Sequence, residues 1–273
     1  MYSYFRMYPI LFKIPLFGLF GYDSFPIYGY GVMVALGFLF GTWFVQREAK
    51  REGENPAQAL DLIFYILIAA ILGSRLLFIL TTDPSLLWKN PLSIFKIWEG
   101  GLVFYGGFIA SVLVGLWYLR KHRLPMWKFF DFFAPAIALG HALGREGCFL
   151  AGCCYGRPLL FDTWYAVIFP VNPSSLAPSG IPLYPTQLLE SGGEFLIFLG
   201  LWWGLRHKKF DGQIFAIYMM VYGLLRFLLE FLRGDPDRGF VFGSTLSTSQ
   251  FIAMILFALG LGLYLYRRKS VRV

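Results

Sequence analysis

The feature that most constrains this chain is a series of long apolar runs. They occupy residues 28–46, 59–82, 100–119, 128–144, 186–205, 212–232 and 249–266. A helix needs about 20 mainly apolar residues to cross the hydrocarbon core of a bilayer. Only 15% of the 273 residues are charged, whereas soluble domains carry about 25%. We therefore predict an all-α membrane protein, a polytopic bundle of about seven transmembrane helices in a single domain, residues 1–273.

Two segments fit this pattern less simply. The fourth run is short and contains Asp131 and Pro135, so we expect it to begin in the interface or to be a broken helix. The stretch 1–20 has the apolar character of a signal peptide. However, two prolines and a lysine interrupt it, and no small-x-small cleavage site follows. We expect this stretch to be retained and to lie at the membrane interface.

The basic residues sit in short tracts between the apolar runs, so membrane topology explains the net charge of +8 better than nucleic-acid binding does. One set of alternate connections holds Arg47, Lys50, Arg51, Arg120, Lys121, Arg123, Lys128, Arg206, Lys208, Lys209, Arg267, Arg268, Lys269 and Arg272. The opposite set holds fewer over longer segments: Arg6, Lys13, Lys89, Lys96, Arg145, Arg157, Arg233 and Arg238. The positive-inside rule therefore predicts a multi-pass protein of the bacterial inner membrane, with a periplasmic N-terminus and a cytoplasmic C-terminus.

Ionisable residues inside the apolar runs are the first functional signal. Arg75, Arg226 and Glu230 fall within predicted spans, where a charge costs about 2.5–3.5 kcal/mol and faces a partner or a wet cavity. Tyr222, Arg226, Glu230 and Arg233 are spaced to line one helix face. A structural ion pair or snorkelling at a helix end is the alternative explanation.

A glycine-rich segment at 144–158 is the second signal, and it opens a long outer, periplasmic connection that extends to residue 185. Its glycines, Gly147 among them, predict tight turns and close backbone approach. Arg145 and Arg157 flank it, and an arginine fork with exposed backbone N–H groups suits a phosphate. The alternative is a looped end of a span.

All three cysteines, Cys148, Cys153 and Cys154, lie in this same segment. The C-x4-C-C spacing is not that of a zinc ribbon. His141 could add a ligand, but packing within the preceding helix is its simpler role. Three interpretations stay open for the thiols: a disulfide, buried packing, and a catalytic or metal-binding role.

The third signal is a turn at 100–107, where Gly101 and Gly106 belong to two glycine pairs around Tyr105. Tyr105 is a candidate hydrogen-bond donor to a polar ligand, or an aromatic-belt residue. Tyr28 and Tyr30 share that ambiguity. Since most of these signals fall in the outer half of the membrane, they could line one cavity for an anionic amphiphile, most simply a phospholipid headgroup.

These motifs, together with Tyr184–Glu190 and the stretch from Tyr222 to Asp237, resemble the phosphatidylglycerol–prolipoprotein diacylglyceryl transferase family over essentially the whole chain. The resemblance implies transfer of a diacylglyceryl group from phosphatidylglycerol to the lipobox cysteine of a preprolipoprotein signal peptide, with no metal or redox cofactor. Phosphatidylglycerol, preprolipoprotein signal peptides and membrane lipids are the partners it implies, whereas no oligomeric state follows. It also implies seven spans with the orientation given above.

By that resemblance, Arg145 and Arg226 are the essential guanidiniums, Glu230 orients Arg226, and Tyr30 lines the lipid site. We add Tyr105 as a candidate catalytic residue. The further substrate-binding candidates are Arg75, Gly101, Gly106, Gly147, Tyr222 and Arg233.

The chain departs from the family pattern at several positions. Tyr105 stands where many members have a histidine proposed as general base, and a phenol is a poor base at neutral pH. Cys148 and Cys153 replace the usual Asn and Glu, and Tyr184 replaces a histidine. Either a histidine base is dispensable, or the chain is a divergent or inactive relative. We expect an active transferase.

Two other functions remain as alternatives. A lipid or anion transporter would show related halves or paired broken helices, and the sequence shows neither. A membrane thiol oxidoreductase would be expected to carry a C-x-x-C motif or a second cysteine segment, and the sequence has neither.

Overall fold

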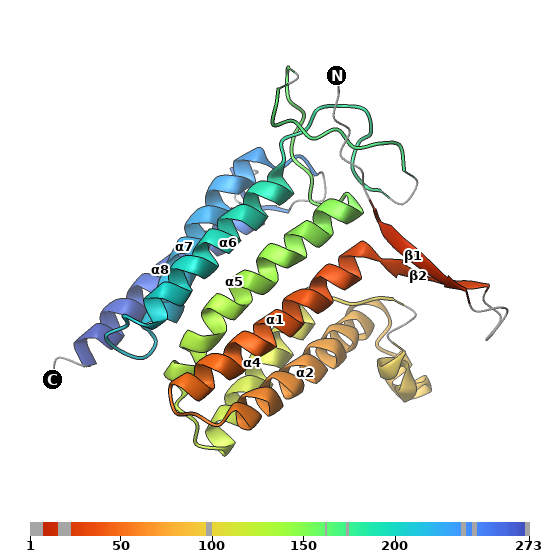
Figure 1. The fold of residues 1–273 in the computed structure, drawn as a ribbon. Helices are drawn as coiled ribbons and strands as arrows, with labels where there is room; N and C mark the ends of the chain where they lie inside the picture. Colours follow the sequence, from red (N-terminus) through yellow and green to blue (C-terminus); the bar gives the residue numbers. More distant parts are fainter. Residues whose placement is uncertain are drawn as a thin grey trace. The chain divides into compact units, whose positions relative to one another are not determined.

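A computed structural model describes residues 8–15, 23–96, 100–161, 163–172, 175–235, 239–241 and 245–270 (Figure 1). Its long helices are α1 (Gly29–Arg51), α2 (Pro56–Thr82), α4 (Phe104–Lys121), α5 (Met126–Ala151), α6 (Thr186–Leu205), α7 (Gln213–Leu229) and α8 (Thr248–Ser270). The short elements are β1 (Ile10–Pro15), β2 (Ser24–Tyr28), α3 (Leu86–Lys89), β3 (Phe240–Val241), β4 (Leu246–Ser247) and the 3-10 turns η2 (Pro91–Phe95) and η4 (Glu230–Leu232). Each predicted run coincides with one long helix. Asp237, which ends one of the predicted motifs, and the basic residues Arg6, Arg238 and Arg272 lie outside the described residues.

Within the described residues, five helices are long and apolar enough to cross a membrane. They are α1, α2, α6, α8, and α7 continued through η4 to Leu232. The chain is therefore a helical membrane protein with five candidate spans. Helices α4 and α5 occupy the third and fourth predicted runs but do not belong to this set.

The chain forms two compact units, one of residues 1–43 with 130–273 and the other of residues 44–129. In the second unit, α2 and α4 pack against each other along a stripe of small residues. A Cβ added at Gly107 would lie 2.7 Å from the Ala70 carbonyl oxygen, and one at Gly106 would overlap Gly73. Close helix packing therefore requires both glycines. The single-domain expectation stays a prediction.

In the first unit, α6, α7 and α8 lie side by side (Figure 1). Gly223 lets α7 approach α8, because a Cβ there would lie 2.7 Å from the Ala253 carbonyl oxygen. Strands β1 and β2 form an antiparallel hairpin directly before α1. Part of the stretch predicted to lie at the interface therefore forms a β-strand.

Helix α5 corrects two expectations. It is one continuous helix of 26 residues with Pro135 inside it, so the fourth run is not a broken helix. It also continues past Arg145 and Cys148 to Ala151, so the first half of the glycine-rich segment is helical rather than looped. Gly144 and Gly147 belong to that helix, and the turn begins only at Gly152, whose φ is +71°.

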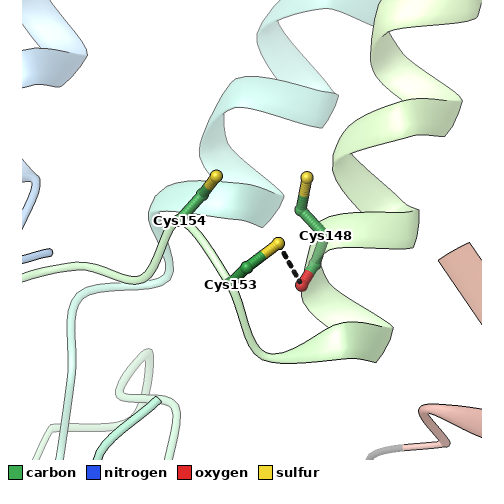
Figure 2. A group of neighbouring side chains, drawn as sticks. All are labelled: Cys148, Cys153 and Cys154. Atoms are coloured by element: carbon green, nitrogen blue, oxygen red, sulfur yellow. Dashed lines mark hydrogen bonds between the residues drawn. The ribbon is translucent and has the colours of Figure 1, made fainter. Parts of the chain in front are cut away.

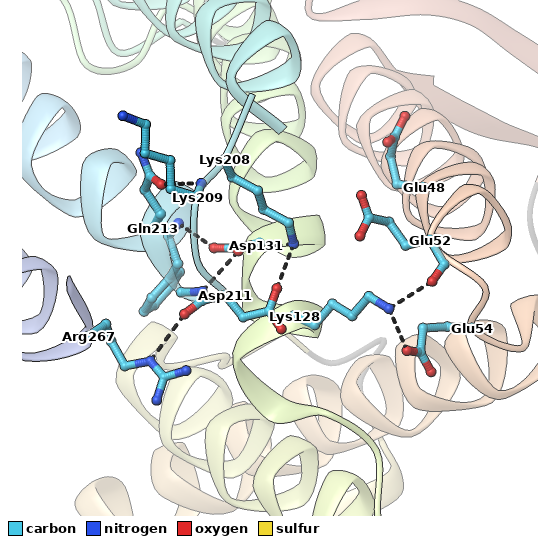
Figure 3. A network of polar contacts seen from close by, with 12 residues as sticks. Glu48, Glu52, Glu54, Lys128, Asp131, Lys208, Lys209, Asp211, Gln213 and Arg267 are labelled. Atoms are coloured by element: carbon cyan, nitrogen blue, oxygen red, sulfur yellow. Dashed lines mark hydrogen bonds and ion pairs between the residues drawn. The ribbon is translucent and has the colours of Figure 1, made fainter. Parts of the chain in front are cut away.

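Asp131 near the start of α5 explains how α7 begins (Figure 3). Its buried carboxylate accepts hydrogen bonds from the backbone N–H groups of Gly212 at 2.9 Å and Phe215 at 3.0 Å. It also lies 3.4 Å from Lys208 Nζ. A carboxylate at this place satisfies unpaired N–H groups and complements the helix dipole. In the other unit, Lys128 Nζ forms an ion pair with Glu54 Oε1 at 2.8 Å.

We expect Asp131→Ala to destabilise the protein by about 1–3 kcal/mol, because it leaves buried N–H donors without an acceptor. Thermal unfolding in detergent, with hydrogen exchange at the Gly212 and Phe215 amides, measures the effect. Asp211→Ala is the matched control, since this more exposed carboxylate pairs with the same Lys208. Equal losses in both variants would contradict a capping role for Asp131.

Candidate arginine–carboxylate site

Three helices of the first unit bring charged groups together that are far apart in sequence. Arg145 on α5 lies 3.0 Å from Glu190 on α6, measured from Nη2 to Oε1. Arg226 on α7 lies 3.9 Å from the other oxygen of the same carboxylate, measured from Nη1 to Oε2. Glu190 is only 2% exposed. One buried carboxylate therefore stands between the two arginines that were predicted to be essential.

The cluster continues on both sides. Arg226 Nη2 lies 2.8 Å from Glu230 Oε2 and donates a hydrogen bond to Ser249 Oγ at 3.0 Å. On the other side, His141 Nδ1 lies 3.1 Å from Glu194, and the His141 ring packs on Tyr222 with centroids 5.3 Å apart. The predicted pairing of Arg226 with Glu230 is present.

The two guanidiniums keep unfilled donor capacity. Arg145 Nε and Arg226 Nη1 are buried and have no hydrogen-bond acceptor among the described residues. Buried polar groups are almost always hydrogen-bonded, so such exceptions require an explanation. A guanidinium presents five N–H donors in a rigid fork that matches a phosphate. The same cluster leaves oxygens of Glu190 and Glu194 without a hydrogen bond among the described residues, so only the free N–H groups of the two guanidiniums are suited to an added acceptor oxygen.

The sequence offers Arg145 no nearby carboxylate except its neighbour Glu146, but Glu190 on α6 supplies one. One sequence-based expectation is wrong here. Arg233 was expected to continue the helix face of Arg226 and Glu230. Instead, α7 ends at Leu229, and Arg233 follows η4 in an extended conformation.

Arg233 ties the glycine-rich segment to the end of α7. It forms a bidentate pair with Asp235, with Nε donating to Oδ1 at 2.7 Å, and a β-bridge with Gly156. Burial lowers the pKa of the Arg233 guanidinium. Its hydrogen bonds to Asp235, together with the electrostatic effect of the nearby Cys154, outweigh burial and raise the pKa above its ordinary value. Arg233 therefore stays charged.

The three cysteine thiols are free and lie together beside this cluster (Figure 2). Arg145 Nη1 lies 4.0 Å from Cys148 Sγ. Contacts with the Cys148 and Cys154 thiols, together with burial, raise the pKa of the Cys153 thiol. Hydrogen bonds from Cys148 and Cys153 lower the pKa of the Cys154 thiol, with Arg233 and Arg145 adding to the effect. The thiols thus interact as one group.

Gly147 and Tyr30 meet where α1 passes α5. A Cβ added at Gly147 would lie 3.1 Å from the Tyr30 ring and 3.2 Å from its Cα. The close backbone approach predicted for this glycine is therefore confirmed, and it packs α5 against α1. The Tyr30 side chain remains half exposed.

The other predicted site residues belong to the second unit. Arg75 is buried and donates hydrogen bonds to the backbone carbonyls of Ser93, at 3.1 Å, and Gly100. Gly101, with a φ of +70°, packs on the Phe78 ring. Tyr105 is 54% exposed. These contacts give Arg75 and the glycines structural roles, and their part in substrate binding stays a prediction.

Sequence reasoning missed Glu190, Glu194 and His141 as site residues. The signal was present, because Glu190 and Glu194 are one helical turn apart inside an apolar run, and ionisable residues there are functional candidates by default. His141 also lies one turn before Arg145. Their importance is evident only once α5, α6 and α7 are packed together.

Fold and site define a helical membrane protein with two largely buried arginines that share one carboxylate. A sequence profile described as "Prolipoprotein diacylglyceryl transferase" matches residues 18–266. A phosphatidylglycerol–prolipoprotein diacylglyceryl transferase of Clostridium tetani is 39% identical, over 93% of this chain and 96% of its own length. Similar transferases of Bordetella parapertussis and Clostridium perfringens are each 37% identical, over 88% and 87% of this chain and 90% of their own lengths. This chain belongs to the prolipoprotein diacylglyceryl transferase family.

Proposed function

We propose that this chain transfers a diacylglyceryl group from phosphatidylglycerol to the lipobox cysteine thiol of a preprolipoprotein. It is a transferase of the family that its relatives represent, and family membership favours this activity over the transporter and oxidoreductase alternatives. In the reaction, the thiol sulfur attacks the glyceryl carbon that carries the phosphate ester. The C–O bond breaks, a thioether forms and glycerol-1-phosphate leaves.

The observation that carries this mechanism is the unfilled donor capacity of Arg145 Nε and Arg226 Nη1. As the C–O bond breaks, negative charge develops on the departing phosphate oxygen. Two guanidiniums held in a water-poor site stabilise that charge without reorganising. We assign Arg145 and Arg226 this role.

Glu190 and Glu230 act as positioning residues in this mechanism. Each occupies one edge of a guanidinium, Glu190 at 3.0 Å from Arg145 and Glu230 at 2.8 Å from Arg226. The two carboxylates orient the guanidinium groups of Arg145 and Arg226 and offset their positive charge while no lipid is bound. The remaining N–H groups can then face the phosphate.

The remaining predicted residues complete the proposal. Tyr30, Gly147, Tyr222 and Arg233 belong to the same unit as the two arginines and are assigned to binding of the lipid and the signal peptide. Arg75, Gly101 and Gly106 are proposed as substrate-binding residues because an arginine within an apolar run and a glycine-bracketed turn suit a polar ligand. Tyr105 is proposed as a hydrogen-bonding catalytic residue.

Mass spectrometry tests the reaction directly. Purified protein is incubated with phosphatidylglycerol vesicles and a lipobox peptide, and we expect the peptide to gain one diacylglyceryl unit. A peptide with serine in place of the lipobox cysteine is the control and should gain nothing. Absence of the mass gain with the cysteine peptide, in protein that is folded and inserted, would overturn the proposed function.

We further propose seven spans in the bacterial inner membrane, with the N-terminus and the site on the periplasmic side. The support is the excess of basic residues on the opposite connections. A reporter that is active only in the cytoplasm should work when fused after Val273 and fail when inserted after Gly180. The reverse pattern would place the arginine site at the wrong leaflet.

A further inference from the structure

The cysteine cluster is a built arrangement that the proposed arginine chemistry does not use. The Sγ atoms of Cys148, Cys153 and Cys154 all lie within 4.8 Å of one another. Cys148 is on the last turns of α5, and the other two follow the helix end (Figure 2). Cys148 is buried and the other two are half-buried. Two of the three cysteines are therefore partly exposed.

The backbone that gathers the thiols is held in an uncommon conformation. Cys154 has a φ of +58°, in the left-handed region that non-glycine residues rarely adopt. Two side chains at the start of α6 fix the turn. Gln187 Nε2 donates to the Cys153 carbonyl at 2.9 Å, and Thr186 Oγ1 donates to the Cys154 carbonyl at 3.1 Å. A strained residue held by its surroundings indicates a functional constraint.

The donor set has the number of protein ligands of a catalytic zinc site. Thiolates are soft ligands that select Zn²⁺ or Cu⁺. No His, Asp or Glu of the described part of the chain joins the three sulfurs in this group. Three protein ligands with a fourth position open distinguish catalytic zinc from four-ligand structural zinc. Zn–S bonds of about 2.3 Å in a tetrahedral site place the sulfur atoms about 3.8 Å apart. Binding of zinc would therefore shorten the sulfur–sulfur distances, now within 4.8 Å, by about 1 Å at most.

We propose that Cys148, Cys153 and Cys154 bind Zn²⁺, and that the open fourth position takes the thiol of the peptide substrate. This inference rests on the proposed function and revises the expectation that the reaction uses no metal. A thiol that coordinates zinc is deprotonated outright. Zinc would therefore supply the thiolate nucleophile in a chain that has Tyr105 where a histidine base is usual.

The step balances without a redox partner. The substrate thiol loses its proton, which leaves with the glycerol-1-phosphate or passes to solvent. The sulfur lone pair forms the C–S bond, and the electrons of the broken C–O bond go to the phosphate oxygen. Arg145 contacts both the cysteine cluster and the arginine–carboxylate cluster, because its Nη1 lies 4.0 Å from Cys148 Sγ and its Nη2 lies 3.0 Å from Glu190. The bound thiol and the phosphate would meet there.

Metal content of the full-length protein gives the first test. Protein purified in detergent under reducing conditions, with zinc supplied, should contain about one zinc per chain, and Cys148→Ser should lose it. Arg157→Lys is the matched control, since Arg157 is exposed in the same segment, and it should keep the metal. A wild-type protein that takes up no zinc, or in which two of the thiols form a disulfide, would overturn the proposal.

Cobalt substitution tests the fourth position without relying on activity. Co²⁺ in the site should show thiolate-to-metal absorption, and a lipobox peptide should change that spectrum while its serine analogue should not. An unchanged spectrum with the cysteine peptide would overturn thiol binding at the metal. If metal-free protein transfers the diacylglyceryl group at the full rate, the zinc role fails while the proposed function stands. If the cobalt spectrum changes with the peptide but no diacylglyceryl group is transferred, the result would support thiol binding at the metal and contradict the proposed transferase function.

Discussion

Arg226→Lys is expected to insert and fold normally but to lose about 10²–10³-fold in turnover, the usual loss when one stabiliser of a developing charge is removed. Lysine keeps the charge that faces Glu230 and Glu190, yet it cannot present a planar fork to the phosphate. Turnover is measured by mass spectrometry of the lipobox peptide, with inserted protein quantified separately. Arg206→Lys is the control, because Arg206 is exposed beyond the end of α6.

A structural explanation of Arg226 makes a different forecast. If Arg226 and Glu230 only neutralise each other, replacing both with Met and Leu should preserve activity, since an apolar swap for a buried pair is often neutral or better. Arg145 and Glu190 remain paired in the double variant. A change in activity can therefore be attributed to the loss of Arg226 and Glu230. We expect a stable, inserted and inactive protein. Full activity of the double variant would remove Arg226 from the mechanism.

The sequence located the helices well because apolar runs in a membrane protein report helix positions directly. The pairing of Arg226 with Glu230 was also predictable, since the two residues are one turn apart on the same helix. The carboxylate partner of Arg145 could not be predicted from the sequence. Glu190 lies on a different helix, and no local periodicity indicates which faces of α5 and α6 meet.

The glycine-rich segment shows a second limit. Glycines at Gly144 and Gly147 were interpreted as turn residues, but glycine in a membrane helix also permits close packing. Only the structure shows that Gly147 faces Tyr30 and that the turn starts at Gly152. The spacing of the cysteines likewise excluded only a zinc ribbon. The end of α5 and the left-handed conformation of Cys154 bring the thiols together, and spacing alone does not predict either feature.

Glu190→Ala is expected to cost about 3–5 kcal/mol of stability, the range for breaking a buried pair so that a charge is left uncompensated. Glu190 is 2% exposed and lies between two arginines, so its loss leaves both cations facing each other without a carboxylate between them. Thermal unfolding in detergent and the yield of inserted protein measure the effect. Glu146→Gln is the control, because it removes a charge one residue from Arg145 at a less buried carboxylate.

A second substitution separates this electrostatic explanation from a simple packing defect. If Glu190→Ala is destabilising because Arg145 is left without its carboxylate, then adding Arg145→Met removes the unpaired cation, while Arg226 keeps Glu230. Much of the stability should therefore return, while turnover stays lost because the phosphate has lost a guanidinium. A cavity left by the glutamate side chain predicts the opposite, since the second change would add its own packing cost. A double variant less stable than Glu190→Ala alone would show that Glu190 acts by packing rather than by holding the two arginines.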